Sequence, residues 1–176
     1  MSGKAEALAV WDWLAAAVAD SPNNANNHRQ VAAQANAGFP GEGPFWGNVA
    51  RIDVAGLPRQ KPALPAGLEA YRATDIAARK DGATPKSVWQ LAGAGVVGAQ
   101  VLTGLPVLQR LRALFPGKVS VWPFEATDTP VVLAEVYPSL LAAEVRAELL
   151  ANPGMAADEA QVRLLAQAIA RLAAQG

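Results

Sequence analysis

The chain has 176 residues, 52% of them hydrophobic and 17% charged, a composition typical of a folded domain and unlike that of a disordered one. It contains no cysteine, which excludes disulfide bonds, cysteine nucleophiles and zinc–thiolate sites, and its formal net charge is zero. No apolar run approaches the roughly 20 residues that span a bilayer, and the N-terminus lacks the layout of a secretion signal. We therefore expect one cytoplasmic domain, residues 1–176, of bacterial type and without contact to a membrane.

The first fifth of the chain predicts two helices joined by a turn. Residues 4–19 place apolar side chains at helical spacing, among them Trp11 and Leu14. Residues 23–27 are rich in asparagine, whose side chains bond their own backbone and favour turns and caps. A short helix is predicted from about His28 to Ala37. His28 is the only histidine, and we expect a surface or capping role for it.

Residues 38–67 are punctuated by glycine and proline and predict a long ordered loop or a linker. Three aromatic residues lie within this stretch, namely Phe39, Phe45 and Trp46. Aromatic side chains in a loop of this kind indicate that the loop packs onto the rest of the protein.

The remaining chain predicts further helices and two short strands. The predicted helices are 68–80, 99–114 (with a kink or a new start at Pro106), 140–150 and 158–174. In the last helix an apolar stripe is expected to face the core, and it consists of Val162, Leu165, Ile169 and Leu172.

The two predicted strands are 119–124 and 131–137. Their link, residues 125–130, is short and predicts antiparallel pairing, since parallel crossovers ordinarily need a dozen residues or more. The chain therefore predicts an α+β fold that is mostly helical, with a small sheet that looks incomplete.

One glycine pattern could carry chemistry. Gly93–Gly98 has the Gly-x-Gly-x-x-Gly spacing of dinucleotide-binding turns, with 87–92 as a possible strand before it. Glu125, at the end of the next strand, would then be the ribose-binding acid. The alternative is a glycine-rich turn that serves helix packing.

Two carboxylates are candidates for a metal site. Glu135 lies in an otherwise apolar strand, where burial of its charge requires a partner or a metal; alternatively it faces water or an arginine at a sheet edge. Asp158 opens the last helix, where it is either a helix cap or a second ligand.

Several segments, in the same order along the chain, resemble a group of bacterial proteins of unknown function regarded as predicted nucleases of the ribonuclease-H-like superfamily. The motifs that carry this resemblance are Arg72-x-x-Asp75-x-x-Ala78-Arg79-x-x-Gly82, Gly95-x-x-Gly98-x-Gln100, Glu135-Val136-Tyr137-Pro138 and Asp158. A closer subset shares Trp11-Asp12-Trp13-Leu14 and Gly43-Pro44-Phe45-Trp46-Gly47, and some of its members bear a molybdopterin-guanine-dinucleotide-synthesis label.

The resemblance implies the C-terminal part of a ribonuclease-H-like domain, whose first, aspartate-bearing strands have no counterpart in this chain. It implies Mg²⁺- or Mn²⁺-dependent phosphodiester hydrolysis in complete relatives. By the same resemblance, Glu135 and Asp158 would be the catalytic metal ligands. Phosphate or ligand contacts would fall to Arg72, Asp75, Arg79 and Gln100.

Whether this chain is an enzyme stays open, and we expect it to be inactive or incomplete by itself. Two alternatives remain beside the nuclease hypothesis. One is a nucleotide-binding protein linked to molybdopterin cofactor metabolism. The other is a non-catalytic interaction module whose sheet is completed by a partner chain or by a second copy. Nucleic acid or a nucleotide is a possible ligand under the first two readings.

Overall fold

The computed structural model is an α+β structure with six α-helices, one short 3₁₀ helix and two strands in the residues that it describes. These residues are 6–23, 25–49, 53–80 and 83–173. Contacts divide the chain into two units, and each is described by itself. Unit 1 comprises residues 1–72 and 86–134, and unit 2 comprises residues 73–85 and 135–176. In the described part of the chain, no helix is both long and apolar enough to cross a membrane.

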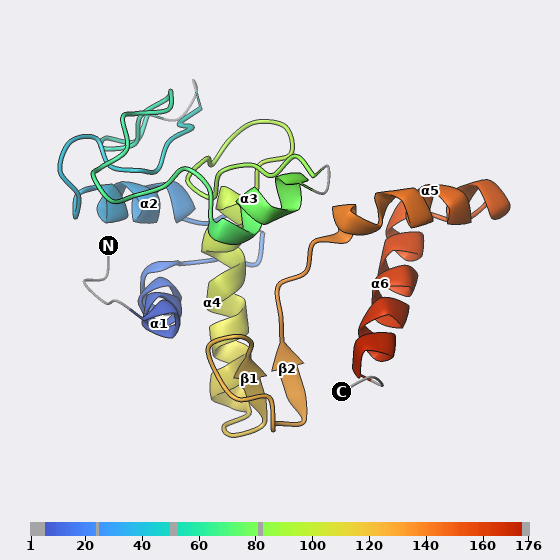
Figure 1. Ribbon diagram of the computed structural model, residues 1–176. Coiled ribbons are helices and arrows are strands. Elements are labelled where there is room, and N and C mark those ends of the chain that lie inside the picture. The colour runs from blue at the N-terminus through green and yellow to red at the C-terminus, as the bar shows by residue number, and fades with distance from the viewer. Residues whose placement is uncertain (1–5, 24, 50–52, 81–82, 174–176) are drawn as a thin grey trace. The chain divides into compact units, whose positions relative to one another are not determined.

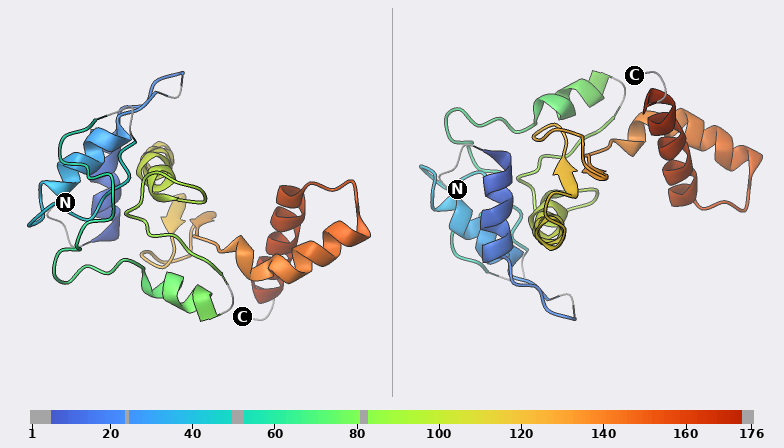
Figure 2. Two further views of the ribbon diagram at one scale, coloured as in Figure 1. Left: turned by 90° about the horizontal axis from the view of Figure 1, so that it is seen from above. Right: turned by 90° about the horizontal axis from the view of Figure 1, so that it is seen from below.

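Unit 1 is built around three helices: α1 (Ala7–Ala17), α2 (His28–Asn36) and α4 (Gly98–Leu114). Both α1 and α2 pack on α4 (Figures 1 and 2). Leu14 and Val18 lie in the hydrophobic core with Leu102, as the helical spacing predicts for the first helix. Pro106 lies inside α4, which continues through it without ending, so the alternative of a second helix beginning there is wrong.

The asparagine-rich segment joins the end of α1 to the start of α2. The Asn27 side chain accepts a hydrogen bond from the Ala19 N–H at 2.8 Å and donates one to the Ala17 carbonyl at 3.0 Å. It thereby satisfies backbone groups that the end of a helix leaves without partners. The turn or cap predicted at 23–27 is confirmed for Asn23 and 25–27, and position 24 lies outside the described residues.

The long glycine- and proline-rich loop is part of unit 1, and a buried asparagine side chain anchors it. Asn36, at the end of α2, is only 3% exposed. Its amide nitrogen donates to the carbonyls of Phe45 and Gly56, and its oxygen accepts from the Phe45 N–H, each at 2.9 Å. Phe45 itself lies in the core, edge-on to Trp89, with ring centroids 5.0 Å apart. The aromatic residue therefore packs as predicted.

The two strands, β1 (Val119–Val121) and β2 (Val131–Leu133), are shorter than predicted and pair in parallel. The predicted antiparallel arrangement is wrong. Strands this short rise by roughly 7 Å, so the link 122–130 has to return only on the order of 10 Å. A link of that length could span roughly 30 Å when extended, and no helical crossover is needed.

Unit 2 contains α3 (Ala73–Lys80), the 3₁₀ helix η1 (Pro138–Leu141), α5 (Ala142–Ala151) and α6 (Ala157–Ala173). α5 and α6 are consecutive helices that pack on each other, and both contact η1 (Figure 1).

The predicted core stripe of α6 is largely exposed. Val162 and Leu172 are each 69% exposed and Ile169 is 50% exposed, while the buried residue of this helix is Ala160. The prediction that the stripe faces the core is wrong. Helical periodicity shows that an apolar face exists, but it does not show what covers that face.

Candidate functional site

The most deeply buried carboxylate of the described chain is Asp75, in the first turn of α3, with 1% of its surface exposed. The Tyr137 hydroxyl donates a hydrogen bond to its Oδ1 at 3.0 Å. A buried carboxylate is costly unless such donors surround it. Both residues also take part in further interactions. The pair therefore joins α3 to the segment before η1, within unit 2.

This contact brings together two motifs that lie 62 residues apart in the sequence. Asp75 belongs to the Arg72–Gly82 motif, and Tyr137 belongs to Glu135-Val136-Tyr137-Pro138. Ala78 of the first motif is also buried, at 5% exposure. Asp75 thus has a structural partner, whereas the resemblance had assigned it to ligand contact.

The remaining sequence-predicted residues fall in both units. Arg79, in the last turn of α3, and Asp158, in the first turn of α6, belong to unit 2, and both are exposed. Arg72 and Gln100 belong to unit 1, and both are exposed. Arg72 and Arg79 each have an interaction partner, so neither is a free cation.

Glu135 lies two residues beyond the C-terminal end of β2, where the hypothesis of a metal ligand places it. Glu135 is exposed, and Val131 and Val132 of the strand before it are 46% and 40% exposed. Of the two alternatives for Glu135, burial is therefore wrong, and an exposed carboxylate at a sheet edge agrees with the structure. An apolar run does not by itself distinguish a covered strand from the edge of a two-stranded sheet. Glu135 does take part in an interaction of its own.

The described residues contain no ready cluster of metal ligands. In residues 6–23, 25–49, 53–80 and 83–173, no group of three or more His, Cys, Asp or Glu side chains is placed to hold a metal ion. Of the acidic residues that the resemblance selects, Asp75 is already bonded to Tyr137. Glu135 and Asp158 are both exposed.

The glycine segment does not have the context of a dinucleotide-binding turn. Residues 83–97 contain no strand; they form turns and one isolated parallel bridge between Gln90 and Trp46. Gly93 and Gly95 have φ angles of 126° and 69°, which favour glycine. A Cβ on Gly98 would lie 2.3 Å from the Gln90 carbonyl oxygen. The last glycine therefore allows the start of α4 to approach this backbone closely.

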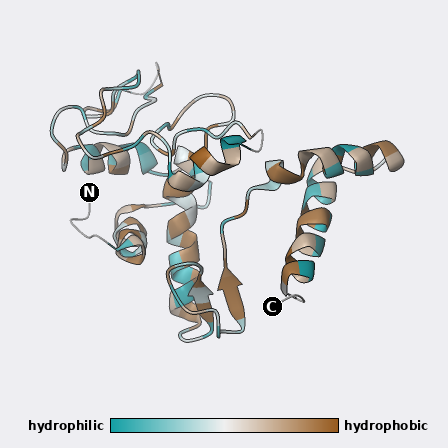
Figure 3. Ribbon diagram, in the orientation of Figure 1, coloured by the Kyte–Doolittle hydropathy of each residue, from teal (hydrophilic) through white to brown (hydrophobic). Residues whose placement is uncertain are grey.

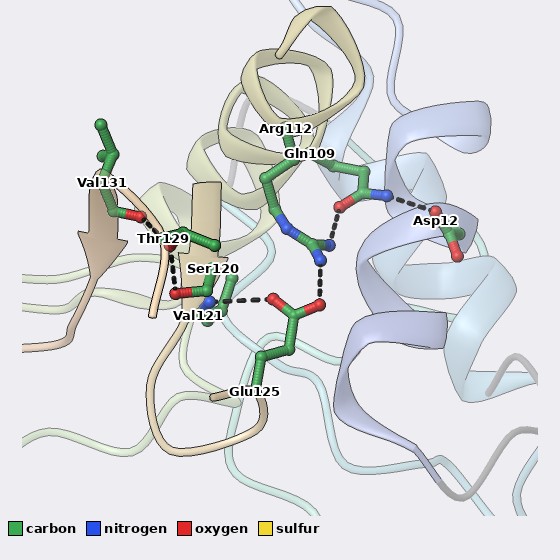
Figure 4. A network of polar contacts seen from close by, with 8 residues as sticks. All are labelled: Asp12, Gln109, Arg112, Ser120, Val121, Glu125, Thr129 and Val131. Atoms are coloured by element: carbon green, nitrogen blue, oxygen red, sulfur yellow. Dashed lines mark hydrogen bonds and ion pairs between the residues drawn. The ribbon is translucent and has the colours of Figure 1, made fainter. Parts of the chain in front are cut away.

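A polar network ties the end of α4 to β1 and α1 within unit 1 (Figure 4). The Arg112 guanidinium donates to the Glu125 carboxylate and, at 2.8 Å, to Gln109, whose amide in turn donates to Asp12 of α1. The second oxygen of Glu125 accepts the Val121 N–H at 2.9 Å. Glu125, the candidate ribose-binding acid, is thus bonded to an arginine and to a strand.

A cavity of about 390 Å³ lies beside this network and is lined by polar residues, among them Ser120, Asp128 and Thr129. The Ser120 and Thr129 hydroxyl oxygens are 2.8 Å apart, and the Thr129 hydroxyl also lies 2.8 Å from the Val131 carbonyl. Neither hydroxyl has a histidine beside it, since the one histidine of the chain is the first residue of α2. The cavity therefore does not combine a serine with a histidine base.

His28 begins α2, and its Nδ1 is paired with the Asn26 side-chain oxygen. Burial lowers the pKa of His28 below its usual 6.5, and the neighbouring Arg29 lowers it further. Its Nε2 is buried and has no partner among the described residues. Protonation of that nitrogen is unfavourable, because the added charge would meet neither water nor an acceptor.

Sequence reasoning missed the partners in these networks. The residues of the Arg112–Glu125 and Asp12–Gln109 contacts are 13 and 97 positions apart. No local periodicity links such residues. The one available signal was the presence of Asp12 and Tyr137 inside motifs quoted for the resemblance.

Comparisons with known protein families, with curated proteins and with solved structures find no match to this chain.

Proposed function

We propose that this chain is a non-catalytic relative of the ribonuclease-H-like predicted nucleases and that it acts by binding a partner. The observation that carries the proposal is the buried Asp75–Tyr137 hydrogen bond. It joins two motifs of the resemblance in space, which supports common descent. It also uses an acidic motif residue to hold the fold, which supports a role without catalysis.

The chemistry of the remaining acids supports the same proposal. Phosphodiester hydrolysis of the two-metal kind needs carboxylates that clamp both ions. Glu135 and Asp158 are the two carboxylates that the resemblance assigns to this role, and both are exposed. An exposed pair of this kind can attract a divalent cation weakly, but it does not supply a fixed coordination shell.

The experiment is a cleavage assay on fluorescent single- and double-stranded DNA and RNA with Mg²⁺ or Mn²⁺. We expect the rate to equal that of buffer alone, for the natural chain and for Glu135→Gln. Glu144→Gln is the matched control, because it makes the same glutamate-to-glutamine replacement in α5. Cleavage that requires the metal and is lost in Glu135→Gln but kept in Glu144→Gln would refute the proposal.

A further inference from the structure

The small sheet of unit 1 has one closed edge and one open edge. On β1, the outward Val121 N–H donates to the Glu125 carboxylate, and the Val121 carbonyl accepts from the N–H groups of Phe124 and Glu125. The chain's own turn thus occupies this edge. No further strand can add at Val121 without displacing the Arg112–Glu125 ion pair.

The edge of β2 is open. The Val131 N–H donates to the Lys118 carbonyl and the Leu133 carbonyl accepts from the Trp122 N–H, so both residues face β1. In a parallel pair, the residue between them directs its N–H and C=O to the opposite side. Within the described residues, the Val132 backbone groups have no hydrogen-bond partner on that side.

The side chains of this edge are apolar and carry no charge. Val131 and Val132 are 46% and 40% exposed, and Figure 3 shows β2 in the hydrophobic colours. No charged residue occurs from Thr129 to Ala134. Natural sheet edges are usually protected by charge, proline or a bulge. Here the protecting features are Pro130, at the start of the strand, and the length of β2, which is only three residues.

We propose that the open edge of β2 pairs antiparallel with the same edge of a second copy, about a two-fold axis at Val132. In this register the Val132 N–H of each copy donates to the Val132 carbonyl of the other copy. Each Ala134 N–H meets the carbonyl of the other copy's Pro130. The Ala134 carbonyl receives no bond in return, since Pro130 has no N–H to donate, and at this end of the strand it is left to solvent.

The side chains of the strand suit the same register. Val131 lies opposite Leu133 of the second copy, and Val132 lies opposite its counterpart, so the cross-strand neighbours are apolar and no like charges meet. Because the β1 edge is closed, growth stops at a four-stranded sheet. Such an assembly is a closed dimer and does not continue as a fibre. A two-stranded sheet by itself is only marginally stable, whereas a sheet of three or more strands with a hydrophobic face can be stable.

This contact is small. A three-residue edge covers far less than the roughly 800 Å² per partner of a stable complex. We therefore expect a weak dimer that forms at about 10 µM to 1 mM. The inference rests on the proposed binding role, but it is tested by association and not by cleavage, so the two can fail separately.

The test is sedimentation velocity of the full chain from about 10 µM to 1 mM, with amide exchange followed by NMR. We expect a concentration-dependent dimer in the natural chain, and slower exchange of the Val132 amide as the concentration rises. The Val131 amide, already bonded to Lys118, should exchange at the same rate throughout.

Two variants test the edge itself. Val132→Pro removes an outward N–H and spares the bonds between β1 and β2, whereas Val131→Pro, the matched control, breaks one of those bonds. We expect Val132→Pro to remain folded and monomeric at the highest concentration. Val132→Lys places two ammonium groups together on the axis and should reduce association at least tenfold even if the proline variant fails to fold.

Three results would overturn the proposal. The first is a natural chain that stays monomeric up to 1 mM. The second is a dimer that persists in Val132→Lys and is lost in Ile169→Lys, which would assign association to α6. The third is an unchanged Val132 amide exchange in a dimer, because the edge would then be free in both copies.

Discussion

The glycine at the start of α4 allows a paired test of helix packing. An alanine at Gly98 would place its Cβ 2.3 Å from the Gln90 carbonyl oxygen and 2.5 Å from that of Val88. Both atoms belong to the backbone, so relief requires a shift of the helix or of the segment 88–90. An alanine at Gly104 of the same helix meets nothing within 4 Å.

These distances set the expected magnitudes. Gly98→Ala should lower the free energy of unfolding by about 3 kcal/mol, in the upper part of the range for overpacking. Gly104→Ala should raise it by about 1 kcal/mol, because alanine loses less conformational freedom in a helix interior. For a chain of this size the melting temperatures should differ by roughly 8–16 °C.

Urea titration monitored by circular dichroism measures both variants, with a thermal melt as the second readout. Similar stabilities for the two alanine variants would refute the reasoning. They would mean that the start of α4 does not approach the carbonyls of residues 88 and 90 in solution. The close approach would then no longer explain why a glycine occupies position 98.

Further predictions follow from single contacts. Tyr137→Phe removes one hydrogen bond from the buried carboxylate of α3 and should cost about 2 kcal/mol in a urea titration, while an unchanged stability would exclude the bond. Leu14→Ala should cost about 2–5 kcal/mol, whereas Leu172→Ala should cost less than about 0.5 kcal/mol, and equal costs would contradict the burial described. Because the pKa of His28 is lowered, the fold should lose stability as the pH falls from 6.5 toward the folded pKa; His28→Gln should flatten that part of a stability–pH curve. Nicotinamide and flavin dinucleotides should not bind in calorimetry, and micromolar affinity that is lost in Gly95→Val would show the opposite.

The helices could be predicted because their signals are local. The spacing of Trp11, Leu14 and Val18 fixes a buried face within one turn of each residue, and the structure buries all three. The pairing of β1 with β2 could not be predicted in the same way. Its direction depends on how short the strands are, and a pattern of apolar residues leaves strand ends uncertain by several positions.

The sequence identifies the motifs of Asp75 and Glu135, and the structure joins these motifs through Tyr137. The sequence does not predict the burial of Asp75 and does not decide between burial and exposure of Glu135, since both depend on contacts made by residues far away in sequence. The apolar stripe of α6 shows the same limit. Its spacing can be read from the helix sequence, but whether other residues bury it depends on the rest of the fold.

The hydrogen bonds of Asn36 to the loop have a consequence for how the sequence can vary. The Asn36 amide anchors the loop at Phe45 and Gly56, and a Cβ on Gly43 would lie 2.6 Å from that side chain. Gly41 precedes both anchor points, and a Cβ on it would meet nothing within 4 Å. Lengthening a loop costs little closure entropy, about 0.6 kcal/mol for each doubling. We therefore expect residues near Gly41 to accept an inserted tag or reporter, and residues 43–45 to reject one.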